Sequence, residues 1–255
     1  MIRELDKNEV NEVYDFVEEV LNAEKYAWLI EAKKGILSYF GDHKQEYQYF
    51  ISEEKSMNGV LVYEPSDFHI LFLLVKQEYR HQDIGSSLLD TLKEKASAFH
   101  ISRVVVNAYE NQKDFYLSNG FEIEGDINSD GGITVISMEY LVDRNNLGKK
   151  VTVVIDRPYG SLHPTLSDVE YLYNYGFIKE DITGDDIEFQ DAYVVGIEEP
   201  VDEFTGYVIG IVYHKNDSTS KWIVAPGGME IKPEEIIQLL GIEEQFYDTR
   251  FVWSK

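Results

Sequence analysis

The sequence contains no cysteine among its 255 residues. Disulfide bonds, a thiolate nucleophile and zinc sites built from cysteine are therefore excluded. Basic residues are also few: 23 lysines and arginines stand against 47 acidic residues, which gives a formal net charge of −24. A charge of this sign and size repels nucleic acid and anionic membrane surfaces, so we expect neither as a partner.

Long apolar runs are missing as well. The N-terminus, MIRELDKNEV, lacks the apolar centre of a signal peptide. No stretch approaches the ~20 apolar residues that cross a membrane, so we expect a cytoplasmic protein. The chain does hold 44% hydrophobic and 13% aromatic residues, enough for the core of one large domain or of two modest ones.

The first half of the chain alternates helical and strand patterns. Apolar residues recur at helical spacing over residues 8–20, and a second helical stretch covers about 26–38. Two strand-like runs around the turn EEKSMNG predict a hairpin. The apolar run HILFLLV (69–75) predicts a central strand that is covered on both faces. The remaining elements of this half are a helix over 86–99, a strand over 103–109, a short helix, and two strands that end near residue 141.

The second half has a different pattern. The polar segment VDRNNLGKK (142–150) predicts a linker. After it, short β-runs are separated by Gly, Pro and Asp turns, and residues 232–251 alone have a helical pattern, which indicates a small barrel or sandwich with a terminal helix. We therefore expect an α+β protein with a mixed-sheet domain over 1–141, the linker, and a small β-barrel domain over 151–255.

The loop YRHQDIGSSLL (79–89) joins the apolar run to the next predicted helix. A helix N-terminus leaves about four N–H groups unpaired, and its dipole favours negative charge. Such a loop can hold a phosphate group where side chains leave room for it. Gly85 and Ser86 are small enough for a close approach, and Arg80 and His81 add positive charge. The alternative is a helix start with ordinary caps and no ligand.

The order of these elements resembles the GNAT family of N-acetyltransferases. The family's loop carries Arg or Gln, two residues, Gly, one residue, and then Gly or Ala. Arg80, Asp83 and Gly85 occupy the three defined positions, with an aspartate in place of the first glycine. The resemblance implies acetyl-CoA as the acyl donor, with its pyrophosphate bound by amides of the loop. The coenzyme contacts that it implies are Leu74, Val75, Arg80, His81, Gln82, Asp83, Ile84, Gly85, Ser86 and Asn111.

A second block, NQKDFYLSNGF (111–121), adds to the resemblance. Asn111 is the predicted N-cap of a short helix, and Asn119–Gly120 is its predicted C-cap. Family members carry the same Phe-Tyr and Gly-Phe pairs. By resemblance, Tyr116 lies near the sulfur of CoA and protonates the leaving thiolate. Packing on an amphipathic helix is the alternative role for this tyrosine.

Direct attack by an amine on a thioester also needs a group, or a path through water, that takes the amine's proton. His69, Glu64 and Glu78 are candidates, and each is also explained as an ordinary surface or strand-end residue. The acceptor is expected to be a small-molecule amine or a protein amino group, and the sequence does not choose between them. GNAT relatives often dimerise, so the resemblance implies a homodimer by analogy.

Three carboxylates, Asp186, Glu188 and Asp191, stand within six positions in front of a β-run. Clustered carboxylates suit Mg²⁺, although a charge run in an acidic chain is usually solvated. The sequence from NYGFI to this cluster resembles family I soluble inorganic pyrophosphatases, which have an OB-like barrel. The resemblance implies that these carboxylates bind Mg²⁺. It also implies that Tyr171, Tyr175 and Lys221 bind pyrophosphate or another phosphorylated ligand.

In that family, Mg²⁺ ions bridge carboxylates and pyrophosphate and generate a hydroxide nucleophile. Residues 160–176 are too few for the family's hairpin of basic and acidic ligands, so we expect a reduced domain, with Arg157 and His163 as replacement cations. Three functions are then open. The leading one is an N-acyltransferase with an appended pyrophosphatase-like domain. The others are an Mg²⁺-dependent phosphoanhydride hydrolase with a CoA-sensing domain, and a non-enzymatic protein with two degenerate ligand-binding domains.

Overall fold

The computed structural model describes residues 1–23, 27–130, 133–164, 169–179, 189–215 and 219–254. The chain forms two compact units. Unit 1 comprises Met1–Ala96 and Arg103–Leu141, and unit 2 comprises Ser97–Ser102 and Val142–Lys255. Within the described residues, no helix combines the length and the apolar character that a membrane span requires.

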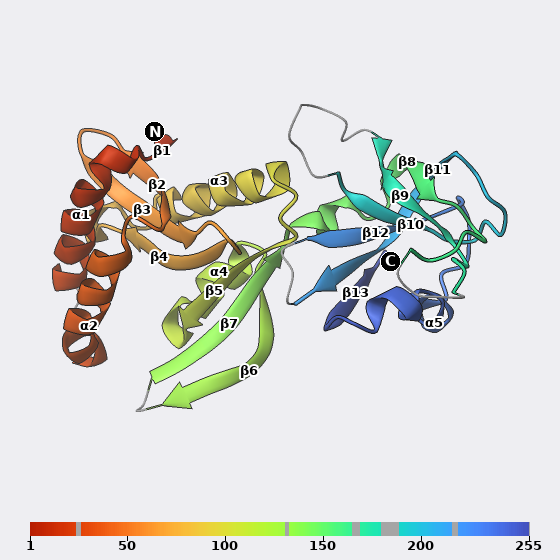
Figure 1. Cartoon of the computed structure of the whole chain (residues 1–255). Coiled ribbons are helices and arrows are strands. Elements are labelled where there is room, and N and C mark those ends of the chain that lie inside the picture. The colour runs from red at the N-terminus through yellow and green to blue at the C-terminus, as the bar shows by residue number, and fades with distance from the viewer. Residues whose placement is uncertain (24–26, 131–132, 165–168, 180–188, 216–218, 255) are drawn as a thin grey trace. The chain divides into compact units, whose positions relative to one another are not determined.

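Unit 1 is built on a seven-stranded sheet in the order β1-β2-β3-β4-β5-β7-β6 (Figure 1). Neighbouring strands are antiparallel except β4 and β5, which are parallel. The predicted hairpin is β2–β3, and the run 69–75 is the central strand β4, as expected. The strands are β1 (Ile2–Glu4), β2 (Gln48–Glu53), β3 (Met57–Glu64), β4 (His69–Val75), β5 (Arg103–Tyr109), β6 (Glu122–Asp130) and β7 (Ile133–Leu141).

Two helices, α1 (Val10–Ala23) and α2 (Ala27–His43), pack on one face of this sheet. α1 has apolar residues every three or four positions, so one stripe of the helix, including Val13 and Phe16, is buried. In α2, Phe40 is fully buried and contacts the β4 side chain Phe72 edge to face, with ring centroids 5.3 Å apart. The helices predicted over 8–20 and 26–38 are confirmed, and both continue further than predicted.

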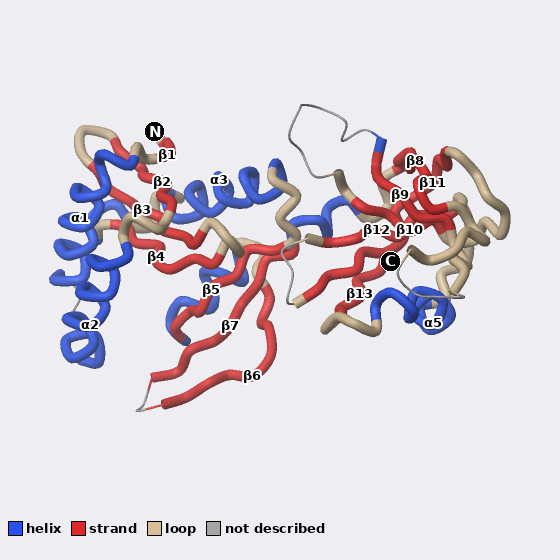
Figure 2. The backbone as a smooth tube through the Cα atoms, in the orientation of Figure 1, coloured by secondary structure: helices blue, strands red, loops and turns tan. Residues whose placement is uncertain are grey.

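The helix α3 (Ile84–Ala98) packs on the opposite face. Gly59 of β3 allows this approach, because a Cβ at that position would lie 2.8 Å from the Cγ2 atom of Ile84. The three leucines that α3 turns inward are fully buried. Helices therefore cover both faces of the central strands (Figures 1 and 2).

The short helix α4 (Lys113–Ser118) begins later than predicted. A 3₁₀ turn, η3 (Glu110–Gln112), carries the chain out of β5, so the N-cap of α4 is Gln112 and not Asn111. At the other end the prediction is confirmed. Asn119 is the C-cap, and Gly120 has a φ of +82°, a left-handed conformation that glycine adopts without strain.

β4 and β5 are paired at two positions, His69↔Val105 and Ile70↔Val106. After these positions the two strands separate. The side chains from Leu71 onward are consequently exposed or half-buried, although they are all apolar, and Leu71 is 37% exposed. The separation opens the middle of the sheet.

Unit 2 contains a six-stranded sheet in the order β12-β10-β9-β8-β11-β13. Because β11 also pairs with β12, five of the strands close into a barrel. The predicted small barrel is therefore present, followed by a helix. The elements are β8 (Lys150–Arg157), β9 (Asn174–Ile178), β10 (Asp191–Val194), β11 (Glu203–His214), β12 (Ser220–Ala225), α5 (Pro233–Glu244) and β13 (Thr249–Trp253).

The structure differs from two predictions for the second half. The segment 142–150, expected as a linker, includes the 3₁₀ turn η4 (Val142–Asn146) and belongs to unit 2. Asp143 in this turn is buried, and its carboxylate accepts hydrogen bonds from Ser220 and Asn146, which offset part of the cost of burial. The helical pattern over 232–251 is a helix as far as Glu244, and its last residues form β13, which pairs with β11.

Candidate functional site

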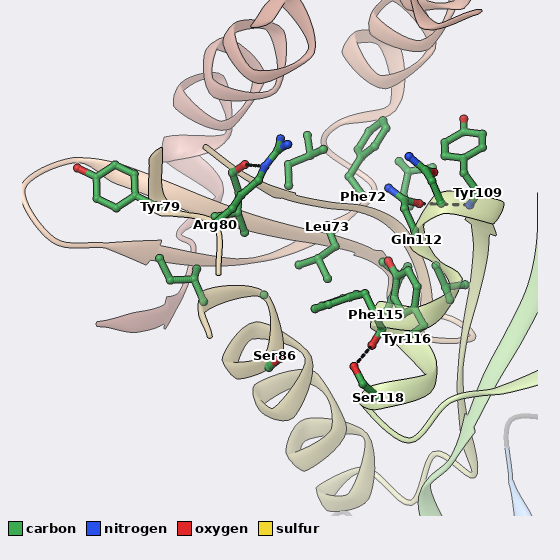
Figure 3. Close-up of a pocket in the computed structure, with 18 of the residues that line it drawn as sticks. Phe72, Leu73, Tyr79, Arg80, Ser86, Tyr109, Gln112, Phe115, Tyr116 and Ser118 are labelled. Atoms are coloured by element: carbon green, nitrogen blue, oxygen red, sulfur yellow. Dashed lines mark hydrogen bonds between the residues drawn. The ribbon is translucent and has the colours of Figure 1, made fainter. Parts of the chain in front are cut away.

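The separation of β4 and β5 opens into a cavity of about 590 Å³ in unit 1. The second half of β4 forms its floor, the loop before α3 forms one end, and the end of β5 with η3 and α4 forms the other. Leu21 of α1 and Ile36 of α2 also line it. Figure 3 shows Phe72 and Tyr109 on one side of β4, and Leu73, Phe115 and Tyr116 on the other.

The main chain of the loop turns sharply before α3. His81 and Asp83 both have left-handed backbones, with φ of 61° and 58°. Aspartate adopts this conformation more readily than most residues, so Asp83 fits where the family motif has glycine. Its carbonyl accepts the N–H of Ser87 at 2.9 Å, which is the first hydrogen bond of α3.

The first turn of α3 faces the cavity with Ile84, Gly85 and Ser86. Within the described part of the chain, the N–H groups of these three residues donate to no main-chain carbonyl, as expected for a helix start. Gly85 packs closely on Phe115, since a Cβ at Gly85 would lie 3.1 Å from the Cζ atom of that ring. The arrangement suits an anion, because free N–H groups and the helix dipole both favour negative charge there.

The side chain of Arg80 is tied to the end of β4. Its Nε donates to the carbonyl of Val75 at 3.0 Å (Figure 3). Gln82 is not among the described lining residues, since its side chain donates instead to the carbonyl of Glu78 at 3.1 Å. The other predicted coenzyme contacts all line the cavity: Leu74, Val75, Arg80, His81, Asp83, Ile84, Gly85, Ser86 and Asn111.

Tyr116 lines the cavity and is 4% exposed. Burial raises the pKa of its hydroxyl above the ordinary value for tyrosine, so the group keeps its proton at neutral pH. Its ring also packs edge to face on Phe115 and Phe121, at centroid distances of 5.2 and 5.3 Å. Tyr116 therefore packs as a core residue and still presents a protonated hydroxyl to the cavity wall.

The three candidate bases do not line the cavity in the described part of the chain: His69, Glu64 and Glu78 are absent from its walls. His69 Nε2 lies 3.2 Å from the amide Nδ2 of Asn107, and Asn107 does line the cavity. The sequence reading missed Asn107, Phe72 and Tyr109. A usable signal was present, because two parallel strands place their carboxyl ends at the same edge of a sheet.

In unit 2, the predicted phosphate contacts are bonded to carboxylates of the chain itself. Tyr171 donates to Glu243 Oε1 at 3.0 Å, and Tyr175 donates to Asp191 Oδ2 at 2.6 Å. Lys221 donates to Glu244 Oε1 at 3.1 Å. Asp186 and Glu188 lie outside the described residues. Among the residues that are described, no group of three or more His, Asp and Glu side chains is placed to hold a metal ion.

Two glutamates at the end of α5 hold this cluster together. Glu244 is buried, which opposes its ionisation, but a hydrogen bond from His214 and the charge of Lys221 outweigh this and lower its pKa to about 2. Glu243 Oε1 lies 3.0 Å from His163 Nε2.

Arg157 joins the same cluster by donating to the Tyr171 hydroxyl at 3.2 Å. Both proposed replacement cations, Arg157 and His163, therefore lie with the predicted phosphate contacts. The carboxylates of Glu243 and Glu244 therefore bind groups that were predicted to bind a phosphate.

Residues 14–142 match the family model described as an acetyltransferase (GNAT) domain. No curated protein sequence is detectably similar to the chain. Solved structures similar to part of it include a GCN5-related N-acetyltransferase from Rhodopseudomonas palustris, with 19% identity over 55% of this chain and 94% of that chain and a TM-score of 0.45.

Two further solved structures are the PaiA N-acetyltransferase from Thermoplasma acidophilum in complex with coenzyme A and the ribosomal-protein-S18-alanine N-acetyltransferase from Escherichia coli. The first has 17% identity over 55% of this chain and 98% of that chain, with a TM-score of 0.43. The second has 16% identity over 56% of this chain and 93% of that chain, with a TM-score of 0.44.

Proposed function

The chain belongs to the GNAT acetyltransferase family, and from this premise we propose that unit 1 transfers an acetyl group from acetyl-CoA to the nitrogen of an amine. The observation that carries the proposal is the first turn of α3. Its N–H groups face a cavity at the end of β4, and Gly85 has no side chain to block them.

The residues present fit the coenzyme. The amides of Ile84, Gly85 and Ser86 would bind its pyrophosphate, and Arg80 would add positive charge beside it. The separated edge of β4 at Leu74 and Val75 would take the extended arm. When bound, acetyl-CoA supplies a thioester, whose carbonyl carbon is the electrophile.

Tyr116 is the proposed general acid, because its buried hydroxyl holds a proton that a departing sulfur can take. In the balanced reaction the amine nitrogen bonds to the acetyl carbon, the carbon–sulfur bond breaks, the sulfur gains a proton and the amine loses one. Apart from His81 and Asp83 of the loop, the described lining residues include no imidazole or carboxylate. We propose that the amine's proton leaves through water.

Isothermal titration with acetyl-CoA and release of the free CoA thiol test this proposal. Because the chain has no cysteine, a thiol reagent reports the product without a signal from the protein. Tyr116→Phe should lower kcat by about 10²-fold or more and leave the acetyl-CoA Kd within about twofold. Tyr207→Phe, which removes an exposed tyrosine hydroxyl of unit 2 that does not line the cavity, is the control. Absence of detectable binding at millimolar acetyl-CoA would contradict the proposal.

A second activity, Mg²⁺-dependent hydrolysis of pyrophosphate by unit 2, is proposed on residue resemblance alone. Two hydrogen bonds argue against it: Lys221 donates to Glu244, and Tyr171 donates to Glu243. An incoming phosphate would have to displace both glutamates. Phosphate release that needs Mg²⁺ and is abolished by Asp191→Asn would support hydrolysis. A lack of release at high enzyme concentration would exclude it.

A further inference from the structure

The cavity of unit 1 has two chemically different sides, because successive side chains of β4 point to opposite faces of the sheet. Phe72 and Leu74 pack against the core beneath α1 and α2, whereas Leu73 lies on the side of Phe115 and Tyr116 (Figure 3). The first turn of α3 packs on Phe115 through Gly85 and so belongs to this second side.

The α1/α2 side therefore carries none of the first-turn amides that are proposed to bind the coenzyme. We define the acceptor wall by its described members: Leu21, Ile36, Phe72, Leu74 and Tyr109. Leu21 belongs to the core cluster of α1 and α2, and Ile36, Phe72 and Leu74 pack against that cluster. Figure 3 draws Tyr109 on the same side of β4 as Phe72, at the end of the cavity away from Tyr79.

The chemistry of this wall is apolar and neutral. Burial raises the pKa of Tyr109, so its hydroxyl is uncharged at neutral pH. The polar groups next to it, Asn107 and Gln112, are amides. The carboxylate of Glu19 on α1 is bound to Lys76, 2.8 Å away, and Arg80 at the other end of the cavity is a cation. A polycation would meet no carboxylate among the described members of this wall, and transfer of a charge into an apolar site is costly.

Resting on the proposed function, we infer that the acceptor is a primary amine on an apolar or aromatic carbon skeleton, and that Phe72 determines this specificity. The skeleton packs on the acceptor wall, and the neutral surroundings favour the uncharged, nucleophilic form of the amine. The nitrogen then approaches the acyl carbon through the gap between β4 and β5. The field of an acidic protein attracts any cationic amine, so the selection occurs at the wall and not during encounter.

The test compares phenethylamine with spermidine as acceptors, with thiol release as the readout, after acetyl-CoA binding has been measured by calorimetry. We expect kcat/KM for phenethylamine to exceed that for spermidine by at least about tenfold. Phe72→Ala should raise KM for phenethylamine about tenfold and leave the acetyl-CoA Kd within about twofold.

Two further variants keep this test decisive. Phe72→Leu retains an apolar side chain in case Phe72→Ala unfolds, and we expect an intermediate KM from it. Tyr39→Ala removes an exposed aromatic of α2 that does not line the cavity, and it should change neither constant.

The outcomes separate the two proposals. Failure to bind acetyl-CoA overturns the proposed function itself. If acetyl-CoA binds but spermidine is the better acceptor, neither amine is acetylated, or Phe72→Leu leaves KM unchanged, the inference about the acceptor is overturned and the coenzyme site stands.

Discussion

The two units place similar polar groups in opposite situations. In unit 1, the first-turn amides of α3 face a cavity of about 590 Å³. In unit 2, two of the groups that resemble a phosphate site, Tyr171 and Lys221, are bonded to Glu243 and Glu244 of the helix α5. Hydrogen-bond donors therefore face a cavity in unit 1 and bind the carboxylates of a helix in unit 2. The two units differ in whether a carboxylate of the chain itself already binds these donors.

The largest effect is expected from removing that internal anion. Glu244→Ala should leave Lys221 and His214 buried without their carboxylate and lower the free energy of unfolding of unit 2 by about 3–5 kcal/mol. Urea unfolding followed by tryptophan fluorescence measures this change. Glu235→Gln on an exposed turn of α5 is the control, with an expected change of less than ~0.5 kcal/mol.

If Glu244→Ala is as stable as the parent protein, the proposed contrast between the two units is contradicted. The cluster would then not anchor α5, and the glutamate would be free to give way to a ligand. Acetyl-CoA binding should remain unchanged in this variant in either case, since Glu244 belongs to unit 2.

A second effect concerns pH. Burial raises the pKa of Asp143 to about 6, against the opposing hydrogen bond from Ser220. A raised pKa in the folded state means that stability is full below the unfolded value and falls as the pH rises through about 6, by ~3 kcal/mol. Asp143→Asn should remove this fall. Urea unfolding of the parent protein and of Asp143→Asn between pH 4 and 7 measures this fall. Because Glu244 titrates in both proteins, the difference between their stabilities reports the contribution of Asp143 alone. Parallel curves would contradict the assignment.

A substitution at Gly85 tests whether the first-turn amides of α3 bind the coenzyme. Gly85→Ala places a Cβ 3.1 Å from Phe115 and beside the first-turn amides, so acetyl-CoA should bind about tenfold more weakly, which is ~1.4 kcal/mol. Gly35→Ala is the matched control, because a Cβ at this position of α2 meets open space. Calorimetry on both proteins gives the answer. Equal affinities would show that these amides do not hold the coenzyme.

The smallest effect is expected at Asp83. Asp83→Gly removes both a carboxylate near the proposed pyrophosphate and the cost of a φ of 58°, so we expect binding tightened a few-fold and a gain in stability below ~1 kcal/mol. Asp83→Asn removes the charge and tolerates the same backbone, so it separates the two causes. Weaker acetyl-CoA binding by Asp83→Gly would show that the carboxylate contributes to the site.

Local pattern was enough to predict most elements of unit 1. The stripe of α1, the apolar run of β4 and the glycine after α4 each act within a few residues, so the sequence shows them directly. The secondary structure at the end of the chain was harder to predict. Residues 249–251 were read as a continuation of the helix, because nothing within the segment shows that β11 offers it an edge.

The site depended more strongly on tertiary structure. The loop motif indicated the coenzyme contacts, but the separation of β4 and β5 follows from how two distant segments pair, and it brought Phe72 and Tyr109 into the cavity. In unit 2, Glu243 lies 72 residues along the chain from Tyr171, its hydrogen-bond partner. No motif of adjacent residues reports such a contact, so its effect on the phosphate contacts was not foreseen.

The parting of β4 from β5 has a consequence for amide protons. Along Leu71–Val75, the described chain supplies no second strand on the side that faces β5. An incomplete edge of this kind is a template for added pairing, and here it lines the cavity. The amides of this stretch that point toward the gap, and not toward β3, should therefore exchange deuterium quickly in the free protein. They should exchange slowly once an occupant pairs with this edge, so exchange at these positions alone reports whether the cavity is occupied.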